Sequence, residues 1–341
     1  MGRHTQTPRR RPVVAVGIAG VVLGALAAFG LAATGAGSGD SSSDQTCSFT
    51  ASAGSFDGSV LHCTTPTTPP TTTAPPTTTP PTTTAPPTSP SPTPTVPPQT
   101  GWPNASNTGV PAGVSLASSG SITVTKAGTV LSGLNITGHV DIRAANVVIK
   151  NTKIAAGSSA YAIQVFTGSV TVQDSTITGS NGFAIGYDNW VGIRLNVSGV
   201  RQDGFKGGDN VTLQDSYIHD FTSSSGAHAD GIQFEGGGSH STIRHNYIDP
   251  ANGGAYGNSA VFIKNDLGGN SAGPIVVDNN LLGGGNYTLY AVPGNGGNQS
   301  GIHIVGNHFL RDFQYGPVDI GYAIAEWSGN VYDSNGVTVA Q

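Results

Sequence analysis

The side chains best suited to chemistry gather in two short, similar segments of the C-terminal half. Asp203 and Lys206 stand in the segment Asp-Gly-Phe-Lys. Asp230 and Gln233 stand in the matching segment Asp-Gly-Ile-Gln, and His228 precedes it by two residues. Lysine and histidine can accept a proton when their surroundings lower their pKa, and paired carboxylates can serve as acid and base. These residue types therefore predict a catalytic site that both segments build.

The first chemistry that fits this set is β-elimination on a uronate-containing sugar chain. The reaction needs a base for the proton at C5, and Lys206 and His228 are the candidates. It also needs positive charge against the sugar carboxylate. Lys264 or Arg244 can supply that charge, or a Ca²⁺ ion held by Asp203 and Asp230, because calcium prefers hard oxygen ligands. An epimerase would use the same groups and return the proton to the opposite face of the sugar.

A glycoside hydrolase is a second reading, with Asp203 and Asp230 as its carboxylate pair. Carboxyl groups about 5–5.5 Å apart indicate a retaining hydrolase, and a separation of about 6.5–9.5 Å indicates an inverting one. Asp-Gly is also a common turn former. The sequence therefore leaves open whether these carboxylates react or only begin a strand.

Non-catalytic glycan binding is the third reading. Tyr187, Trp190 and Tyr290 are candidates for a sugar-stacking surface, and Gln233 is a candidate hydrogen-bonding partner. The same aromatic residues also suit packing between strands. A lysine or histidine within hydrogen-bond reach of a carboxylate would favour an enzyme, whereas scattered polar residues on an aromatic face would favour a binding protein.

These residues need a repeating scaffold, and the chain from about Gly101 to Gln341 provides one. A phrase of alternating apolar residues, then Asn or Asp, then an aliphatic residue recurs at 146–154, 169–177 and 210–218. Looser copies end at Ile136, Val200, Ile248, Leu282, Phe309 and Tyr332. Alternation with period two marks strands, and a repeat near 20 residues fits one coil of a β-solenoid. The sequence predicts an all-β domain coiled as a right-handed parallel β-helix.

A second strand column follows each phrase and fixes which side chains face outward. Its third residues are apolar and should point inward, so its fourth residues should form an outer column: Gln164, Gly186, Lys206, Gln233, Phe262 and Tyr290. Neighbouring coils stack at about 4.8 Å, so Asp203 and Asp230 should lie one above the other. The corner residues should adopt left-handed backbone and can form ladders: Asn151, Asp174, Asn246, Asn279, Asn307 and Asn330.

The repeated phrase gives this domain a resemblance to the right-handed parallel β-helix proteins of the pectate-lyase-like superfamily. The resemblance covers the chain from about residue 101 to its end. It implies a polysaccharide lyase, a glycoside hydrolase, a uronan epimerase, an esterase or a phage tailspike, and the fold alone does not choose among them. The paired Asp-Asp, His-Gly and Arg-x-Lys signatures of the polygalacturonase-like group are absent, which weakens the hydrolase interpretation and leaves the reaction open.

The N-terminus predicts export from the cytoplasm. Arg9-Arg10-Arg11 precedes an apolar run from Val13 to Ala33, and small residues follow it. About 20 apolar residues span a bilayer, so residues 1–36 fit either a cleaved signal peptide or an uncleaved signal anchor. Both place the rest of the chain outside, because the positive charge stays inside. We therefore expect a secreted or surface-anchored protein that meets the membrane only through this segment.

Two further segments separate the N-terminus from the repeats. Residues 37–63 hold Cys47 and Cys63, which we expect to form a disulfide in an oxidising compartment. Residues 64–100 are almost entirely Thr and Pro, a composition typical of an extended linker or stalk.

Charge restricts the partners. The formal net charge is −5, and charged residues make up only 10% of the chain, so nothing indicates nucleic-acid binding. We expect an extracellular polysaccharide as partner, no cofactor other than Ca²⁺, and a monomer, because a β-helix closes its core coil by coil.

Overall fold

The computed structural model describes residues 46–47, 63–64, 101–224, 226–251, 257–269 and 271–341. The chain divides into two units, Met1–Pro90 and Ser91–Gln341. In the first, β1 (Thr46–Cys47) pairs antiparallel with β2 (Cys63–Thr64), and Cys47 stands opposite Cys63. This pairing suits the expected disulfide, which stays a prediction. The export segment and the Thr/Pro-rich linker lie outside the described residues.

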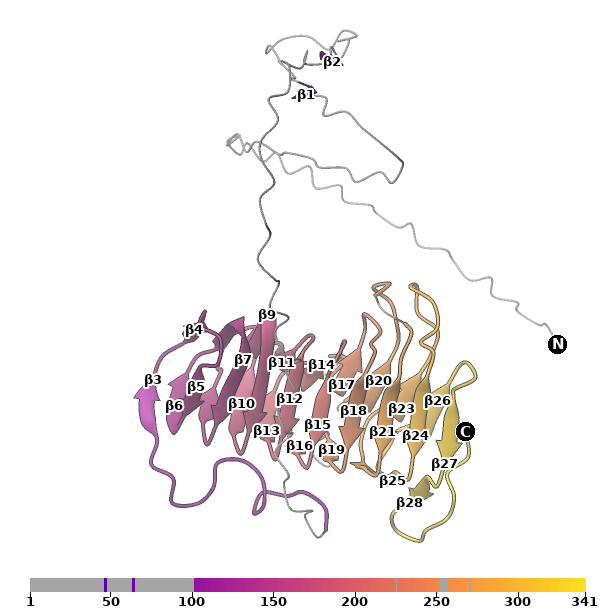
Figure 1. Cartoon of the computed structure of the whole chain (residues 1–341). Helices are drawn as coiled ribbons and strands as arrows, with labels where there is room; N and C mark the ends of the chain where they lie inside the picture. Colours follow the sequence, from indigo (N-terminus) through magenta and orange to yellow (C-terminus); the bar gives the residue numbers. More distant parts are fainter. Residues whose placement is uncertain (1–45, 48–62, 65–100, 225, 252–256, 270) are drawn as a thin grey trace, which may run out of the picture. The chain divides into compact units, whose positions relative to one another are not determined.

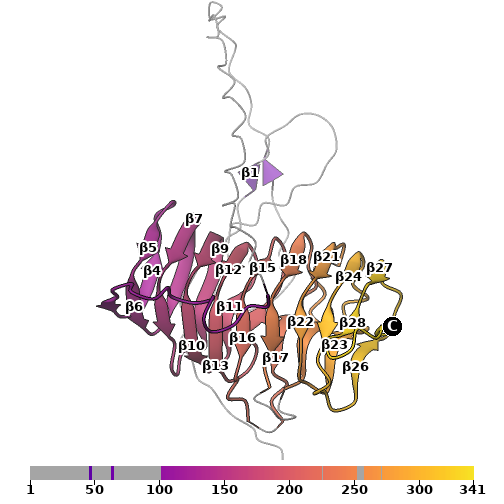
Figure 2. The ribbon, with the colours of Figure 1, turned by 90° about the horizontal axis from the view of Figure 1, so that it is seen from below.

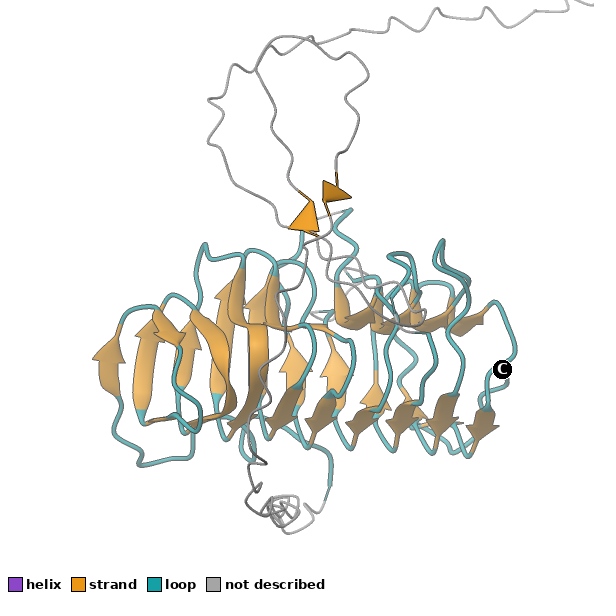
Figure 3. Cartoon of the chain, turned by 45° about the horizontal axis from the view of Figure 1, so that its top comes forward, coloured by secondary structure: helices purple, strands orange, loops and turns teal. Residues whose placement is uncertain are grey.

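The second unit is a three-sided parallel β-helix (Figure 1). Each full coil contributes one strand segment to each of three sides, which we name face 1, face 2 and face 3. Every ladder between its strands is parallel, as the repeat predicted. The described residues contain no helix (Figure 3), and so none that is long and apolar enough to cross a membrane.

Faces 1 and 2 form one continuous sheet because two long strands run through both: β7 (Val140–Lys150) and β9 (Tyr161–Gln173). Face 1 adds β4 (Ile122–Val124), β11 (Phe183–Gly186), β14 (Phe205–Lys206), β17 (Asp230–Phe234), β20 (Ser259–Ile263), β23 (Tyr287–Ala291) and β26 (Gly316–Ile320). Face 2 adds β5 (Val130–Ser132), β12 (Trp190–Ile193), β15 (Thr212–Gln214), β18 (Ser241–Arg244), β21 (Ile275–Asp278), β24 (Ile302–Val305) and β27 (Glu326–Ser328).

Face 3 is a separate sheet. It consists of β3 (Ala117–Ser119), β6 (Leu134–Thr137), β8 (Lys153–Ala155), β10 (Thr176–Ser180), β13 (Asn196–Val200), β16 (Tyr217–His219), β19 (Tyr247–Asp249), β22 (Leu281–Leu282), β25 (His308–Phe309) and β28 (Val331–Tyr332).

The core is a set of stacked apolar columns inside the coil. On face 1 the inward column is wholly buried: Ile163, Ile185, Phe205, Ile232, Val261 and Leu289. Full burial of such side chains stabilises the fold by about 1.5–3 kcal/mol each. The inward assignment of the third position is therefore confirmed.

One repeat boundary predicted from sequence is wrong. The phrase in β13 does not end at Val200, because Ile177 pairs with Val197, and Val197 pairs with Ile218. Val200 lies after Gly199, whose φ of 68° turns the chain, and is also fully buried. Val197 and Val200 are both apolar and buried, so the sequence pattern alone did not show which of them ends the phrase.

The corner between faces 2 and 3 holds two adjacent columns where the sequence suggested one. Left-handed backbone occurs at the first column, for example at Asn151, Asp174 and Asn279, with φ between 48° and 50°. From Thr152 onward the next residue along is buried in each coil, and in the last four coils it is an asparagine: Asn246, Asn280, Asn307 and Asn330.

The four buried asparagines form a ladder along the solenoid. Asn246 Nδ2 donates to Asn280 Oδ1 (2.9 Å), Asn280 Nδ2 to Asn307 Oδ1 (2.9 Å), and Asn307 Nδ2 to Asn330 Oδ1 (3.0 Å). Each accepting oxygen also receives the backbone N–H of the preceding asparagine. The expected ladder is confirmed, with Asn280 rather than Asn279 as its member.

The segment before β3 crosses the outside of several coils (Figure 2). The Trp102 ring lies 5.7 Å from the His245 ring and 5.2 Å from the His308 ring. Farther along, Gly109 N donates to Arg194 O (2.8 Å) and Val110 N to Thr176 Oγ1 (3.1 Å). The start of the domain is thus fastened to late coils before the chain reaches its first coil.

A half-buried carboxyl on face 3 makes stability depend on pH. Burial, and then repulsion from Asp312 and Asp220, raise the pKa of Asp249 to about 7. The folded state therefore holds this proton more tightly than the unfolded chain, so its contribution to stability is full below about pH 4 and is lost as the pH rises to about 7. We expect the free energy of unfolding to fall by on the order of 3 kcal/mol across this window.

Chemical denaturation at pH 5 and pH 8 measures this effect. Asp249→Asn should reduce the difference between the free energies of unfolding at the two pH values, because the amide does not titrate. An equal pH difference in the variant and the parent protein would contradict the assignment to Asp249.

Candidate functional site on face 1

The outer column of face 1 is arranged as the sequence predicted. Gln164 pairs with Gly186, Lys206 with Gln233, Gln233 with Phe262, and Phe262 with Tyr290. Polar side chains therefore stand in the middle coils of one surface, with aromatic side chains on the coils that follow.

Lys206 is the centre of the polar group. Its Nζ lies 2.8 Å from Asp203 Oδ2 and 3.5 Å from Glu235 Oε2, and it donates a hydrogen bond to Gln233 Oε1. The side chain of Lys206 is 14% exposed and that of Asp203 is 5% exposed, whereas that of Glu235 is 39% exposed. Lys206 thus has a close, buried carboxylate partner and a more distant one that faces solvent.

Burial and charge act in opposite directions on this ion pair. Burial lowers the pKa of Lys206, but attraction to Asp203, their hydrogen bond and attraction to Glu235 outweigh burial and raise it above its usual value. Burial raises the pKa of Asp203, and Lys206 offsets only part of that rise. Lys206 therefore rests as an ammonium ion, which suits it to holding a negative charge better than to accepting a proton.

Asp230 lies on the next coil, in contact with Asp203 of the Lys206 group. Its backbone N–H donates to Asp203 Oδ1 (3.0 Å), so the two aspartates are on neighbouring coils, as expected. Asp230 is fully buried; its Oδ1 accepts from Asn258 Nδ2 (3.0 Å) and Ser259 Oγ (2.5 Å), and its Oδ2 has no hydrogen-bond partner among the described residues. Burial, and then repulsion from Asp203, raise the pKa of Asp230 well above its usual value.

The position of Asp230 in its strand explains this burial. Asp230 and Ile232 are two residues apart, so both side chains point to the inside of the coil. The glycines that follow each aspartate are also structural. A Cβ on Gly204 would lie 2.4 Å from Gly231 O, and one on Gly231 would lie 2.5 Å from Ala260 O. Asp230 therefore does not meet a ligand directly, and the hydrolase pair loses one accessible carboxylate.

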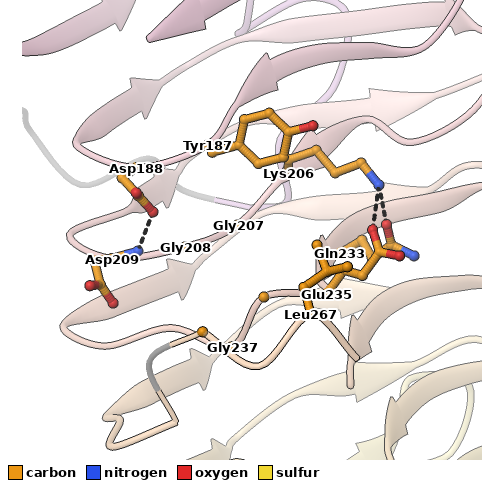
Figure 4. A pocket seen from close by; sticks show the side chains of 12 residues that line it. Tyr187, Asp188, Lys206, Gly207, Gly208, Asp209, Gln233, Glu235, Gly237 and Leu267 are labelled. Carbon is orange, nitrogen blue, oxygen red and sulfur yellow. Dashed lines mark hydrogen bonds and ion pairs between the residues drawn. The ribbon is translucent and has the colours of Figure 1, made fainter. Parts of the chain in front are cut away.

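A pocket of about 320 Å³ opens beside Lys206 (Figure 4). It is lined by Tyr187, Asp188, Lys206, Gly207, Gly208, Asp209, Gln233, Glu235, Gly236, Gly237, Leu267 and Gly269. The glycines leave room above the sheet: a Cβ on Gly208 would lie 1.9 Å from Asp188 Oδ1. Lys206 and Gln233 were expected here, and Glu235 directly follows β17, whereas Asp188 and Asp209 come from turns whose return to this point no periodicity indicated.

Three of the other predicted residues do not join the Lys206 group. His228 is exposed before β17, and no hydrogen bond or ion pair joins it to another described residue. Lys264 directly follows β20, on the coil next to Glu235, but its side chain pairs with Asp266 (2.8 Å) and does not line the pocket. Arg244 is on face 2, where its Nη2 lies 2.6 Å from Asp278 Oδ2. The structure therefore brings Asp203, Lys206 and Gln233 together and leaves these three apart.

The aromatic candidates divide into surface and core residues. Tyr187 is 42% exposed and lines the pocket. Tyr290 lies 5.3 Å from Phe262 and 5.4 Å from Tyr287, ring centre to ring centre, on the outside of face 1. Trp190 is wholly buried, stacked on Phe205, and its Nε1 donates to Tyr187 O (3.1 Å). Trp190 thus supports the pocket wall from inside and offers no surface to a sugar.

Asp203 and Asp230 fit a calcium ion poorly. Calcium takes six to eight oxygen ligands. Both oxygens of Asp203 already accept hydrogen bonds from within the chain, and Asp230 is enclosed. Across the described part of the chain, no three His, Cys, Asp or Glu side chains are grouped to hold a metal.

The comparisons with known proteins add one distant likeness. No family model matches the chain, and no curated protein matches it. A solved structure of an alginate lyase from Paenibacillus sp. str. FPU-7 aligns with 64% of this chain and 89% of that chain, at 12% sequence identity and a TM-score of 0.38. The β-helix assignment itself rests on the strand pairing of this chain.

Proposed function

We propose that the β-helix domain binds an extracellular polysaccharide along face 1 and cleaves it beside Lys206 by β-elimination at a uronate residue. The observation that carries the proposal is the asymmetric pairing of Lys206. Asp203 holds the ammonium in place at 2.8 Å, while Glu235 lies at 3.5 Å and is partly exposed. A sugar carboxylate entering the pocket can replace Glu235 without disturbing the buried pair.

Lys206 would then stabilise the charge that develops during the reaction. Removal of the C5 proton from a uronate places negative charge on the sugar carboxylate, and a fixed ammonium in a partly dry site stabilises it. Lys206 therefore acts as the stabilising cation and not as the base, the role for which its residue type was a candidate.

Tyr187, as the phenolate, is the candidate acceptor of the C5 proton, which it can then donate to the leaving oxygen as the bond between C4 and that oxygen breaks. It is exposed, lines the same cavity as Lys206, and its side chain lies beside that of Lys206 in Figure 4. Tyrosine is among the side chains that serve as general acids and bases. His228, the other candidate from sequence, lies outside the pocket lining.

The aromatic side chains beyond the pocket extend the surface available to a sugar chain. Four aromatic rings contact one another in sequence over successive coils, with ring centres 5.3–5.8 Å apart: Phe262, Tyr290, Tyr287 and Tyr315. Such rings pack against the apolar faces of sugars while leaving polar groups exposed. The expected export segment and linker would present this surface outside the cell.

A panel of uronate-containing and neutral polysaccharides tests the proposal. Ultraviolet absorbance reports unsaturated uronate, and a reducing-end assay reports any cleavage. We expect both signals to grow on a uronate-containing polymer, to fall strongly in Tyr187→Phe, and to persist in Arg244→Ala, which breaks an ion pair on face 2.

The other outcomes are equally informative. Reducing ends without absorbance would contradict elimination and favour hydrolysis. Retention on a polysaccharide column with neither signal would favour a glycan-binding protein, a candidate that Lys206 and the aromatic surface also support.

A further inference from the structure

A second group of reactive side chains lies on the first coils of face 1, apart from the Lys206 pocket. Ile122 of β4 pairs with Val140 of β7, which sets Ser121 opposite His139 on the neighbouring coil. His139 and Asp141 are two residues apart, so their side chains leave the same side of the chain. The fold thus gathers a serine, a histidine and an aspartate from two adjacent coils.

The distances order these three side chains in a line. Ser121 Oγ lies 3.3 Å from His139 Nδ1, and His139 Nε2 lies 3.7 Å from Asp141 Oδ1. The backbone N–H of His139 also donates to Ser121 Oγ (3.1 Å). In the tautomer with its proton on Nε2, at ion-pair distance from the aspartate, the ring leaves its Nδ1 lone pair to receive the serine proton. This is the logic of a serine–histidine–aspartate triad with the two ring nitrogens exchanged.

Other contacts hold the aspartate in position. Tyr161 Oη donates to Asp141 Oδ1 (3.0 Å), and Arg143 Nη2 lies 3.9 Å from Asp141 Oδ2. Arg143 is itself packed over the Phe166 ring at 4.1 Å. The Asp141 side chain is 15% exposed, whereas that of His139 is 37% exposed and Ser121 is exposed. The orienting group is thus sheltered and the nucleophile is accessible.

We propose that Ser121, His139 and Asp141 form a second catalytic site, which hydrolyses short O-acyl esters. Ser121 Oγ attacks the ester carbonyl carbon while its proton passes to His139 Nδ1. The C–O bond to the alcohol then breaks, and the alcohol leaves with that proton. Water attacks the acyl-serine, His139 again carries the proton, and the carboxylic acid and free Ser121 are released.

The place of this site on the molecule indicates its substrate class. Asp141 pairs with Gln164, so it stands in the same outer column as Lys206. An exposed nucleophile tolerates a bulky alcohol, and a sugar hydroxyl carrying an acetyl group meets that condition. The choice of an acylated glycan rests on the proposed function, but the ester chemistry does not.

Two readouts on the full-length protein test the proposal. The first is hydrolysis of p-nitrophenyl acetate and release of acetate from an acetylated uronate polymer. The second is labelling with a fluorophosphonate, located by peptide mass mapping. We expect Ser121→Ala and His139→Ala each to lower the hydrolysis rate at least about tenfold, with the label on Ser121.

The matched control is Ser159→Ala. Ser159 Oγ lies 3.5 Å from the same His139 Nδ1, but on the other neighbouring coil. Hydrolysis that survives in Ser121→Ala, a label on Ser159, or no hydrolysis and no label in the parent protein would each overturn the proposal. Unsaturated-uronate formation should be unchanged in Ser121→Ala, so failure here is distinguishable from failure of the proposed elimination.

Discussion

Asn280→Ala should lower the free energy of unfolding by about 4 kcal/mol. Asn280 Oδ1 accepts hydrogen bonds from the backbone N–H and from Nδ2 of Asn246. Asn280 Nδ2 donates hydrogen bonds to Asn307 Oδ1 and to Ile243 O (both 2.9 Å). Alanine removes all of these bonds at once and leaves buried polar groups without partners, each at a cost of about 1–3 kcal/mol. Denaturant unfolding followed by circular dichroism measures the loss.

Asn279→Gly is the matched control for this variant. Asn279 is the adjacent residue, is exposed, and has a φ of 50°, which glycine adopts without strain. Its stability should change by less than about 1 kcal/mol. If both substitutions lowered the free energy of unfolding equally, the loss would come from the corner as a whole and not from the asparagine ladder.

Lys206→Met should abolish the elimination activity, with a loss of at least about 100-fold in rate, and should also change how stability depends on pH. Methionine keeps the length of the side chain and removes the charge. Asp203 would then be buried without its ammonium partner, so its pKa would rise further. A carboxyl whose pKa is raised in the folded state loses its stabilising contribution as the pH increases. The variant should therefore be weakened more at pH 8 than at pH 5.

Lys264→Met is the control that distinguishes an effect on the pocket from the effect of removing any lysine charge. Lys264 also pairs with a carboxylate at 2.8 Å, but its side chain is 33% exposed and lies outside the pocket lining. We expect activity within about twofold of the parent protein and no added pH dependence, since exposed pairs contribute little. Activity that persists in Lys206→Met would contradict the assigned role, whatever the polysaccharide.

Strand periodicity predicted the scaffold and the outer column because both depend on a local rule. Side chains two residues apart point to the same side, and this placed Lys206, Gln233 and Tyr290 on one surface. The same rule places Asp230 inside the coil with Ile232, although a carboxylate at this position also suggested a catalytic residue. Applying the alternation uniformly would have identified Asp230 as a buried residue.

The remaining features depend on contacts between distant loops. Nothing in the spacing of Asp188 and Asp209 shows that they meet beside Lys206 around one pocket. Trp190 reads as a surface aromatic because its segment is polar, yet it begins a face 2 strand and points into the core. Such placements follow from loop lengths and corner geometry, which a repeat of variable length does not fix.

The fastening of Trp102 has a mechanical consequence. Any tension that reaches the domain through the preceding chain enters at residue 101, and the first ring contacts it loads are those with His245 and His308. These residues belong to the coils that the asparagine ladder joins, so the force would be spread over several coils in shear before the exposed edge at β3 and β4 is pulled. A domain held in this way resists being unwound coil by coil from its first strand.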